Sequence, residues 1–189
     1  MEIKYLGGLG VQVLGKKESV LINPEQKRLE SKVFASRIVA FTSKKYDFLG
    51  VEGERVVLRG PGEYEIGGIE ISGYNGGEGE TVYVMMVEGL RVGVIGNLTE
   101  ELSEKRIERI DSVDVLLVAI GEEGVGIKTI LGWAKKWGVN VIVPIGDDQK
   151  QLEKFLDLVD SEGLEAKESY RVEKENLPEG MEVVVLKEI

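Results

Sequence analysis

The order of the hydrophobic segments is the sequence feature that most constrains the fold of this chain. In the first half, short apolar runs separated by glycines or charged turns predict strands, as at 4–6, 11–14 and 19–22. In the second half, such runs alternate with segments whose apolar residues recur at helical spacing, most clearly at 127–137. The chain thus contains two successive sets of elements, each with strands followed by strand–helix units. This order predicts an α/β protein with two sheets packed face to face and helices outside.

The remaining elements follow from the same patterns. Further strands are predicted at 37–42, 55–58, 68–72, 81–87, 90–95, 113–120, 139–144 and 182–186. A helix capped by Thr99 and another marked by apolar residues at 152–159 are also expected. Residues 74–80 and 121–126 are predicted to be loops. With no linker in its 189 residues, the chain is expected to form one domain, 1–189, of two similar halves, roughly 1–95 and 96–189.

Charge and composition exclude several classes of partner. The net charge of −10 argues against nucleic acids and anionic membranes, which both need clustered basic residues. No apolar run is long enough to span a bilayer, and the first residues do not resemble a signal peptide. We therefore expect a cytoplasmic protein. Abundant Glu, Lys, Val and Ile with few Asn and Gln are typical of heat-adapted proteins.

The sequence contains no histidine and no cysteine. Histidine is the usual general base near neutral pH and the commonest metal ligand. Its absence excludes serine–histidine triads and histidine-based zinc or iron sites, and the absence of cysteine excludes disulfides and thiol catalysis. Chemistry based on carboxylates, lysine, serine, threonine or tyrosine remains open.

Six short motifs carry a resemblance to a known family. They are Tyr5-Leu6-Gly7-Gly8-Leu9-Gly10, Asn23-Pro24, Thr42-Ser43-Lys44-Lys45-Tyr46-Asp47-Phe48, Gly60-Pro61-Gly62-Glu63-Tyr64-Glu65, Gly96-Asn97-Leu98 and Val143-Pro144-Ile145-Gly146. Together they resemble the framework of the metallo-β-lactamase superfamily, in particular its ascorbate-phosphate-lactonase-like branch. The fourth motif resembles a stretch of a small bacterial subfamily of this fold. The resemblance implies a four-layer αββα sandwich.

The same resemblance locates the family's metal ligands, and this chain lacks them. We call the corresponding residues the vestigial positions: Gly8, Ser43, Lys45, Asp47, Phe48, Asn97 and Gly146. Of these, only Asp47 keeps the family's residue. Zinc needs converging imidazoles and carboxylates, whereas a lysine repels a cation and a glycine offers no side-chain donor. We therefore expect no zinc, iron or manganese, no other cofactor, no catalytic residue of the family's kind, and a fold that needs no metal.

These losses favour a catalytically inactive protein, kept as a structural, binding or assembly module. One alternative is a metal-independent hydrolase that uses Lys45, Asp47, Asp147 or Asp148 in the former cleft. Another is a small-ligand binder. A protein partner or a homo-oligomer is compatible with this interpretation, but the sequence identifies neither.

Three further signals each have a plain structural alternative. Residues 121–129 resemble a phosphate-binding loop, but the lysine does not directly follow the last glycine, which favours a glycine-rich turn. Glu63 and Glu65 share one face of a strand, where structural hydrogen bonding is favoured over acid–base catalysis. Lys45 has two interpretations. Its positive charge replaces that of the metal beside Asp47, or both Lys45 and Asp47 are solvated.

Overall fold

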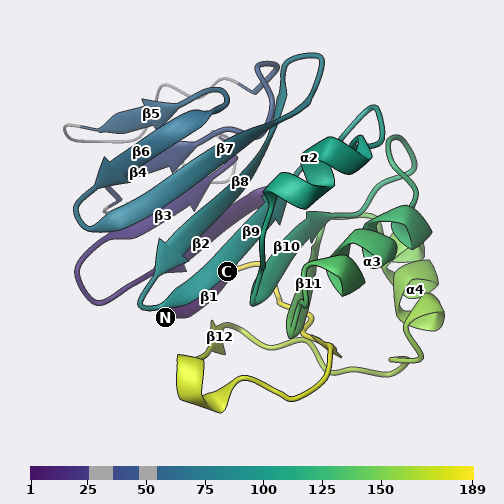
Figure 1. Cartoon of the computed structure of the whole chain (residues 1–189). Helices are drawn as coiled ribbons and strands as arrows, with labels where there is room; N and C mark the ends of the chain where they lie inside the picture. The colour runs from purple at the N-terminus through teal and green to yellow at the C-terminus, as the bar shows by residue number, and fades with distance from the viewer. Residues whose placement is uncertain (26–35, 47–54) are drawn as a thin grey trace.

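Two β-sheets form the body of the protein in a computed structural model that describes residues 1–25, 36–46 and 55–189 (Figure 1). Within these residues, the first sheet has the strand order β12-β1-β2-β3-β4-β5 and the second β13-β11-β10-β9-β8-β7-β6. The first sheet contains β1 (Glu2–Gly7), β2 (Gly10–Leu14), β3 (Ser19–Ile22), β4 (Ile38–Ala40), β5 (Val56–Leu58) and β12 (Tyr170–Arg171). The second contains β6 (Gly62–Ile66), β7 (Ile69–Gly77), β8 (Glu80–Val87), β9 (Leu90–Ile95), β10 (Val115–Ala119), β11 (Val141–Ile145) and β13 (Glu182–Val183).

Each sheet mixes antiparallel and parallel pairs. Strands β1 to β3 are antiparallel, as the short glycine turns predict, while β3, β4 and β5 run parallel. In the second sheet β6 to β9 are antiparallel, and β9, β10, β11 and β13 are parallel. Strands β10 and β11 are almost entirely buried, because layers cover both of their faces.

The main core lies between the sheets. Ile3, Val13 and Ile22 from the first sheet meet Tyr83 and Leu117 from the second, and all five side chains are essentially inaccessible to solvent. Burying an aliphatic side chain of this size contributes about 1.5–3 kcal/mol. This shared core fixes the two sheets relative to each other, and with them the loops at their edges.

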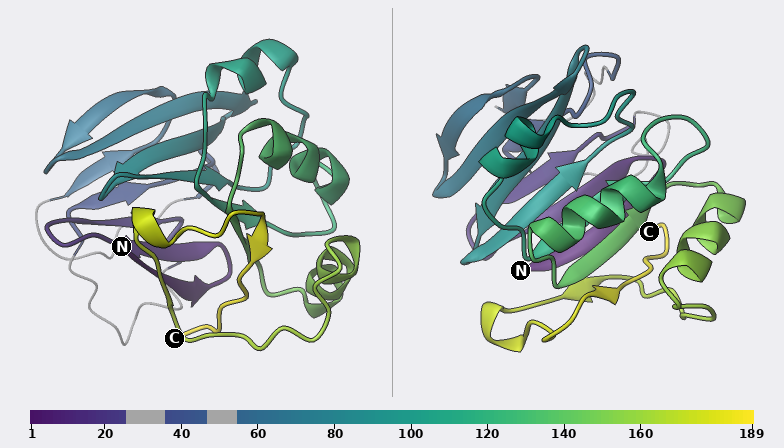
Figure 2. Two further views of the ribbon diagram at one scale, coloured as in Figure 1. Left: turned by 60° about the horizontal axis from the view of Figure 1, so that its bottom comes forward. Right: turned by 45° about the vertical axis from the view of Figure 1, so that its right-hand side comes forward.

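A 3-10 turn, η1 (Lys174–Asn176), follows β12. The described α-helices are α2 (Glu104–Arg109), α3 (Ile127–Lys136) and α4 (Gln149–Leu158). All three lie on the outer side of the second sheet (Figure 2), where Trp133, Trp137 and Phe155 form a second core with Ile142. The Trp137 indole donates a hydrogen bond to the Ile107 carbonyl at 3.0 Å. The predicted sandwich of two sheets with outer helices is thus confirmed. Among the described residues, no helix lies outside the first sheet.

Two predictions about local structure were wrong. Thr99 does not cap a helix: α2 begins at Glu104, and the Thr99 amide instead donates to the Glu80 carboxylate at 2.8 Å. The segment 74–80 is not a loop throughout, because β7 extends to Gly77 and pairs with β8. The strand that carries Glu63 and Glu65 is β6, a half-buried edge strand.

The C-terminal segment joins the two sheets at their shared edge. Strand β12 pairs with β1, and β13 pairs with β11. Beyond β13, the Ile189 amide donates to the Tyr5 carbonyl at 3.1 Å. The end of the chain therefore extends both sheets. No helix among the described residues is both long enough and apolar enough to cross a membrane.

Candidate functional site

The vestigial positions that the structure describes follow strand ends or occupy a turn beside them. Ser43 follows β4, Asn97 follows β9 and Gly146 follows β11. Because β9, β10 and β11 are parallel, their C-terminal ends lie at one edge of the second sheet. Gly8 lies in the turn between β1 and β2, and its amide donates to the Asp147 carboxylate at 2.9 Å. We call this region the vestigial edge.

The backbone conformation of Gly8 disfavours a ligand side chain. Its φ of 59° is left-handed, and a Cβ atom there would overlap Glu25 Oε1 and lie 2.7 Å from Glu25 Cδ. Glu25, two residues after Asn23, thus has its carboxylate in the space that a histidine at position 8 would use. Sequence analysis did not single out Glu25, although its place directly after Asn23-Pro24 is a usable signal.

Gly146 is closed to a side chain by the main chain itself. Its φ of 150° is unfavourable for other residues, and a Cβ atom would lie 2.6 Å from the Ile120 carbonyl oxygen. Asn97, which the resemblance places at the family's bridging carboxylate, is exposed and lies beside Gly121, whose Cβ would stand 3.7 Å from Asn97 Oδ1. Both the backbone conformation and the nearby Ile120 carbonyl therefore disfavour a side chain at position 146.

Asn23 connects the strand ends of the first sheet. Its φ is 43°, and its side-chain oxygen accepts the Thr42 amide at 2.8 Å while its nitrogen donates to Thr42 Oγ1 at 2.9 Å. Both residues are buried. Thr42 also occupies the space above Gly96, so that this pair holds the end of β4 against the end of β9.

The residues after Thr42 differ in exposure: Lys44 and Lys45 are exposed, and Tyr46 is half-buried. Ser43 is buried, and its hydroxyl accepts the Lys45 amide at 3.3 Å. The side chain of Lys45 is exposed. Asp47 and Phe48 lie outside the described residues, so the suggested pairing of Lys45 with Asp47 and the packing of Phe48 into the former site stay predictions.

A zinc ion, which this fold implies, does not fit the residues present. The sequence supplies no imidazole and no thiolate. In the parts of the chain that the structure describes, no three aspartates or glutamates converge as metal ligands. The described vestigial positions supply one hydroxyl, one amide and one ammonium, which are poor zinc ligands.

Tyr46 shows the electrostatic character of the vestigial edge. Burial raises the pKa of the Tyr46 phenol above its ordinary value, and the carboxylates of Glu80 and Glu25 raise this pKa further. Glu80 is itself buried and accepts the Thr99 amide and hydroxyl at 2.8 and 3.2 Å. The local field is negative, although Lys45 lies one residue from Tyr46.

Titration of the tyrosines at alkaline pH should reveal the raised pKa of Tyr46. Burial is the largest cause of a raised pKa for Tyr46, Tyr83 and Tyr170. A raised native pKa means that the unfolded chain releases its protons first, so stability should be complete below about pH 10 and fall as pH rises through the native values. Phenolate absorbance, followed as the pH rises, should show tyrosines that ionise above their ordinary pKa. The Tyr46→Phe variant should have one such tyrosine fewer. If Tyr46→Phe removes an early-ionising group instead, the assignment is wrong.

We call the stretch Gly60-Pro61-Gly62-Glu63-Tyr64-Glu65 the framework motif. Its contacts hold the backbone and a neighbouring strand in place. The hydroxyls of Tyr64 and Tyr83 donate to the Gly60 carbonyl at 3.2 and 3.3 Å. Glu63 accepts the Ser72 hydroxyl at 2.7 Å, and both Glu63 and Glu65 are exposed. Pro61 and Gly62 lead into β6. The motif thus anchors an edge strand.

Other sequence candidates also have structural partners. Asp148 caps α4 by accepting the amides of Lys150 and Gln151 at 2.9 and 3.2 Å. Asp147 accepts the Tyr5 hydroxyl at 2.8 Å in addition to the Gly8 amide. In the glycine-rich segment, the Val125 amide donates to the Leu98 carbonyl at 2.9 Å, as expected of a packed turn.

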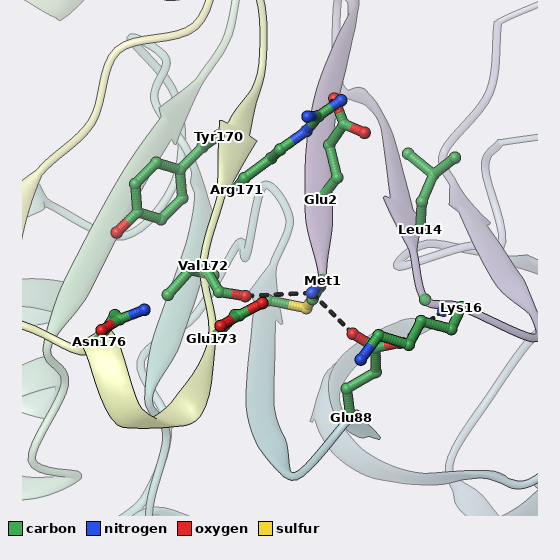
Figure 3. Close-up of a pocket in the computed structure, with 11 residues that line it drawn as sticks. Met1, Glu2, Leu14, Lys16, Glu88, Tyr170, Arg171, Val172, Glu173 and Asn176 are labelled. Carbon is green, nitrogen blue, oxygen red and sulfur yellow. Dashed lines mark hydrogen bonds and ion pairs between the residues drawn. The ribbon is translucent and has the colours of Figure 1, made fainter.

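A cavity of about 640 Å³ lies away from the vestigial edge, beside the chain's N-terminus (Figure 3). The Met1 ammonium contacts the Glu88 carboxylate at 2.8 Å and the Val172 carbonyl at 3.1 Å. The hydrogen bond from this ammonium, with one from the Lys16 amide, lowers the pKa of Glu88. Arg171 lies 3.4 Å from Glu2. Oppositely charged groups in this cavity thus pair with one another.

The two packed sheets with outer helices define a class: sandwich proteins of the metallo-β-lactamase fold. The chain belongs to the metallo-β-lactamase superfamily, since a family model described as a β-lactamase superfamily domain matches residues 2–146. A search of curated proteins found no match.

Solved structures share the fold. A candidate zinc-dependent hydrolase of the superfamily from Thermotoga maritima is 24% identical, with a TM-score of 0.84 and 98% of each chain covered. The metallo-β-lactamase-fold protein YhfI from Bacillus subtilis is 11% identical, with a TM-score of 0.63, covering 99% of this chain and 97% of its own. Igni18, a metallo hydrolase from Ignicoccus hospitalis, is 13% identical with a TM-score of 0.59, covering 91% and 99%.

Proposed function

We propose that this protein is a metal-independent member of its superfamily that acts as a binding or assembly module and not as a metal-dependent hydrolase. The backbone at Gly146 carries this proposal, because its φ of 150° and the nearby Ile120 carbonyl exclude a ligand side chain. The Glu25 carboxylate over Gly8 and the absence of histidine support it. The name of the Thermotoga maritima structure suggests the opposite, a zinc-dependent hydrolase.

A metal-independent hydrolase is the second candidate. Of its four suggested residues, Asp148 caps α4, and Asp147 is held by Tyr5 and Gly8. Exposed Lys45 and Asp47, which lies outside the described residues, remain as candidates. The structural partners of the two described aspartates favour the binding module.

Metal analysis tests the proposal directly. Protein purified without chelator should contain far less than one equivalent of zinc, iron or manganese. Dialysis against EDTA should leave the melting temperature unchanged within about 1 °C, because removing a ligand destabilises only a protein that binds it. Phosphodiester, phosphomonoester and lactone substrates should not be hydrolysed faster with added zinc. A near-stoichiometric metal, or a large loss of melting temperature in EDTA, contradicts the proposal.

Domain organisation, location and the kind of target are also part of what we propose for this protein. We take residues 1–189 as a single domain acting in the cytoplasm, with a small ligand, a protein partner or a second copy as its target. The net charge of −10 supports a target other than nucleic acid or an anionic membrane.

A further inference from the structure

The hairpin of β7 and β8 carries the one Asn-Gly pair in the sequence, Asn75-Gly76 (Figure 1). In such a pair, the amide nitrogen after the asparagine can attack the side-chain carbonyl carbon, and glycine hinders this attack least because it has no Cβ atom. The other asparagines are followed by Pro24, Leu98, Val141 and Leu177. Proline has no N–H, and the other three residues carry bulky side chains. The chain therefore has its most reactive asparagine at position 75.

The side chain of Asn75 is folded back onto the main chain that follows it. Asn75 is exposed to solvent, and its Oδ1 atom accepts the Gly77 amide at 2.9 Å. This hydrogen bond spans Gly76, so it holds the side-chain carbonyl beside the residue whose nitrogen would attack it. The bond also draws electron density from the carbonyl, which makes the Cγ atom a better electrophile.

The pairing of β7 with β8 is interrupted at the same point. Asn75 lies opposite Thr81 and Gly77 opposite Glu80, with a register shift between them, so Gly76 has no opposite residue in β8. A bulge of this kind leaves its extra residue outside the regular ladder. The Gly76 peptide unit is therefore held less firmly than those in the middle of β7.

Packing explains why position 76 holds a glycine. A Cβ atom there would lie 2.8 Å from Leu98 Cδ2 and 3.3 Å from the main chain of Glu80. Leu98 is buried, so its side chain has little room to withdraw. Close packing thus favours, after Asn75, the residue that leaves its carbonyl most open to attack.

We propose that Asn75 is a site of spontaneous deamidation. The Gly76 nitrogen forms a bond with Asn75 Cγ, the bond from Cγ to Nδ2 breaks, and Nδ2 leaves as ammonia with the proton that the Gly76 nitrogen loses. Water then opens the five-membered imide ring at either of its carbonyls. Opening at Cγ gives aspartate, and opening at the main-chain carbonyl gives isoaspartate, in which the chain continues through the former side chain. The reaction consumes only water and does not depend on the proposed function.

Isoaspartate at position 75 would act on the vestigial edge through the hairpin turn. It adds one carbon atom to the main chain and displaces the side-chain acceptor. A few residues further on, the Gly79 carbonyl accepts the Lys44 amide at 2.9 Å, and the Glu80 carboxylate accepts the Thr99 amide at 2.8 Å. Both contacts depend on the course of this hairpin. Deamidation therefore loosens the vestigial edge irreversibly as the protein ages.

Ageing the full chain at mildly alkaline pH, in water labelled with heavy oxygen, tests the proposal. Asn97 and Asn176 are internal controls, because both are exposed and both precede leucine. Peptide mass spectrometry, after digestion in unlabelled water, should show label at position 75 at least about fivefold faster than at either control, a difference of about 1 kcal/mol in the barrier. A separate chromatographic peak should contain isoaspartate. Equal rates at the three positions, or no label at position 75, overturn the proposal.

An Asn75→Ser variant tests the consequence for the fold. Serine has no amide to lose, while its hydroxyl can still accept an amide of the turn. Fully aged native protein should melt about 3 °C lower than fresh protein, and the amides of Lys44 and Thr99 should exchange faster with solvent. Asn75→Ser should melt at the same temperature fresh and aged, whereas the matched variant Asn97→Ser should age as the native protein does. An equal loss in aged Asn75→Ser contradicts the role of Asn75.

Discussion

A Gly146→His variant, which restores the family's last ligand, should lose about 3 kcal/mol of its free energy of unfolding and gain no affinity for zinc. The backbone there has a φ of 150°, which only glycine adopts without strain. The added Cβ would also press on the Ile120 carbonyl oxygen, 2.6 Å away. That carbonyl belongs to the main chain between β10 and α3 and has little freedom to withdraw.

Urea unfolding monitored by tryptophan fluorescence measures the loss, since Trp133 and Trp137 are buried in the second core. Gly180→His is the matched control, because a Cβ at Gly180 meets no atom within 4 Å and its φ is not positive. The control should lose less than about 0.5 kcal/mol. Equal losses in the two variants, or zinc bound by Gly146→His, would show that position 146 tolerates a ligand.

An Asn23→Ala variant should lose about 3 kcal/mol of stability. It removes the acceptor of the Thr42 amide and the donor to Thr42 Oγ1, and it leaves those two groups of a buried residue without these partners. It also places alanine at a φ of 43°, which asparagine tolerates better.

Asn23→Gly separates the two causes. Glycine accepts the positive φ freely, so this variant should keep only the hydrogen-bond part of the loss and be about 1 kcal/mol more stable than Asn23→Ala. Thermal and urea unfolding of both variants measure the difference. If Asn23→Gly is as stable as the native protein, the hydrogen bonds to Thr42 contribute nothing, and the role assigned to Asn23 is wrong.

Much of the fold could be predicted because its signals are local. The apolar runs at β10 and β11 and the helical spacing of α3 are visible in a few residues each. Strand β6 has no apolar run, because Glu63 and Glu65 alternate with half-buried Tyr64, a pattern typical of an edge that faces water. Thr99 was misassigned because its better partner, Glu80, lies nineteen residues earlier in the chain.

The family resemblance could suggest positions for absent ligands, but the sequence could not show what surrounds those positions in the fold. The carboxylate of Glu25 above Gly8 and the carbonyl of Ile120 above Gly146 are contacts between separate loops. The Asp147 carboxylate is bound by residues about 140 positions away. Such contacts depend on the packing of the two sheets, and no spacing along one segment encodes them.

The pairing of β12 with β1 bears on how this protein is made. Glu2 lies opposite Arg171, so β1 finds its outer neighbour only when synthesis has passed Arg171. Until then, the N-terminal sheet presents an unpaired strand edge, which invites association with other nascent chains. Closing such a distant pair is slow compared with forming local hairpins. Deleting residues from the C-terminus should therefore lower the soluble yield in cells through aggregation during synthesis.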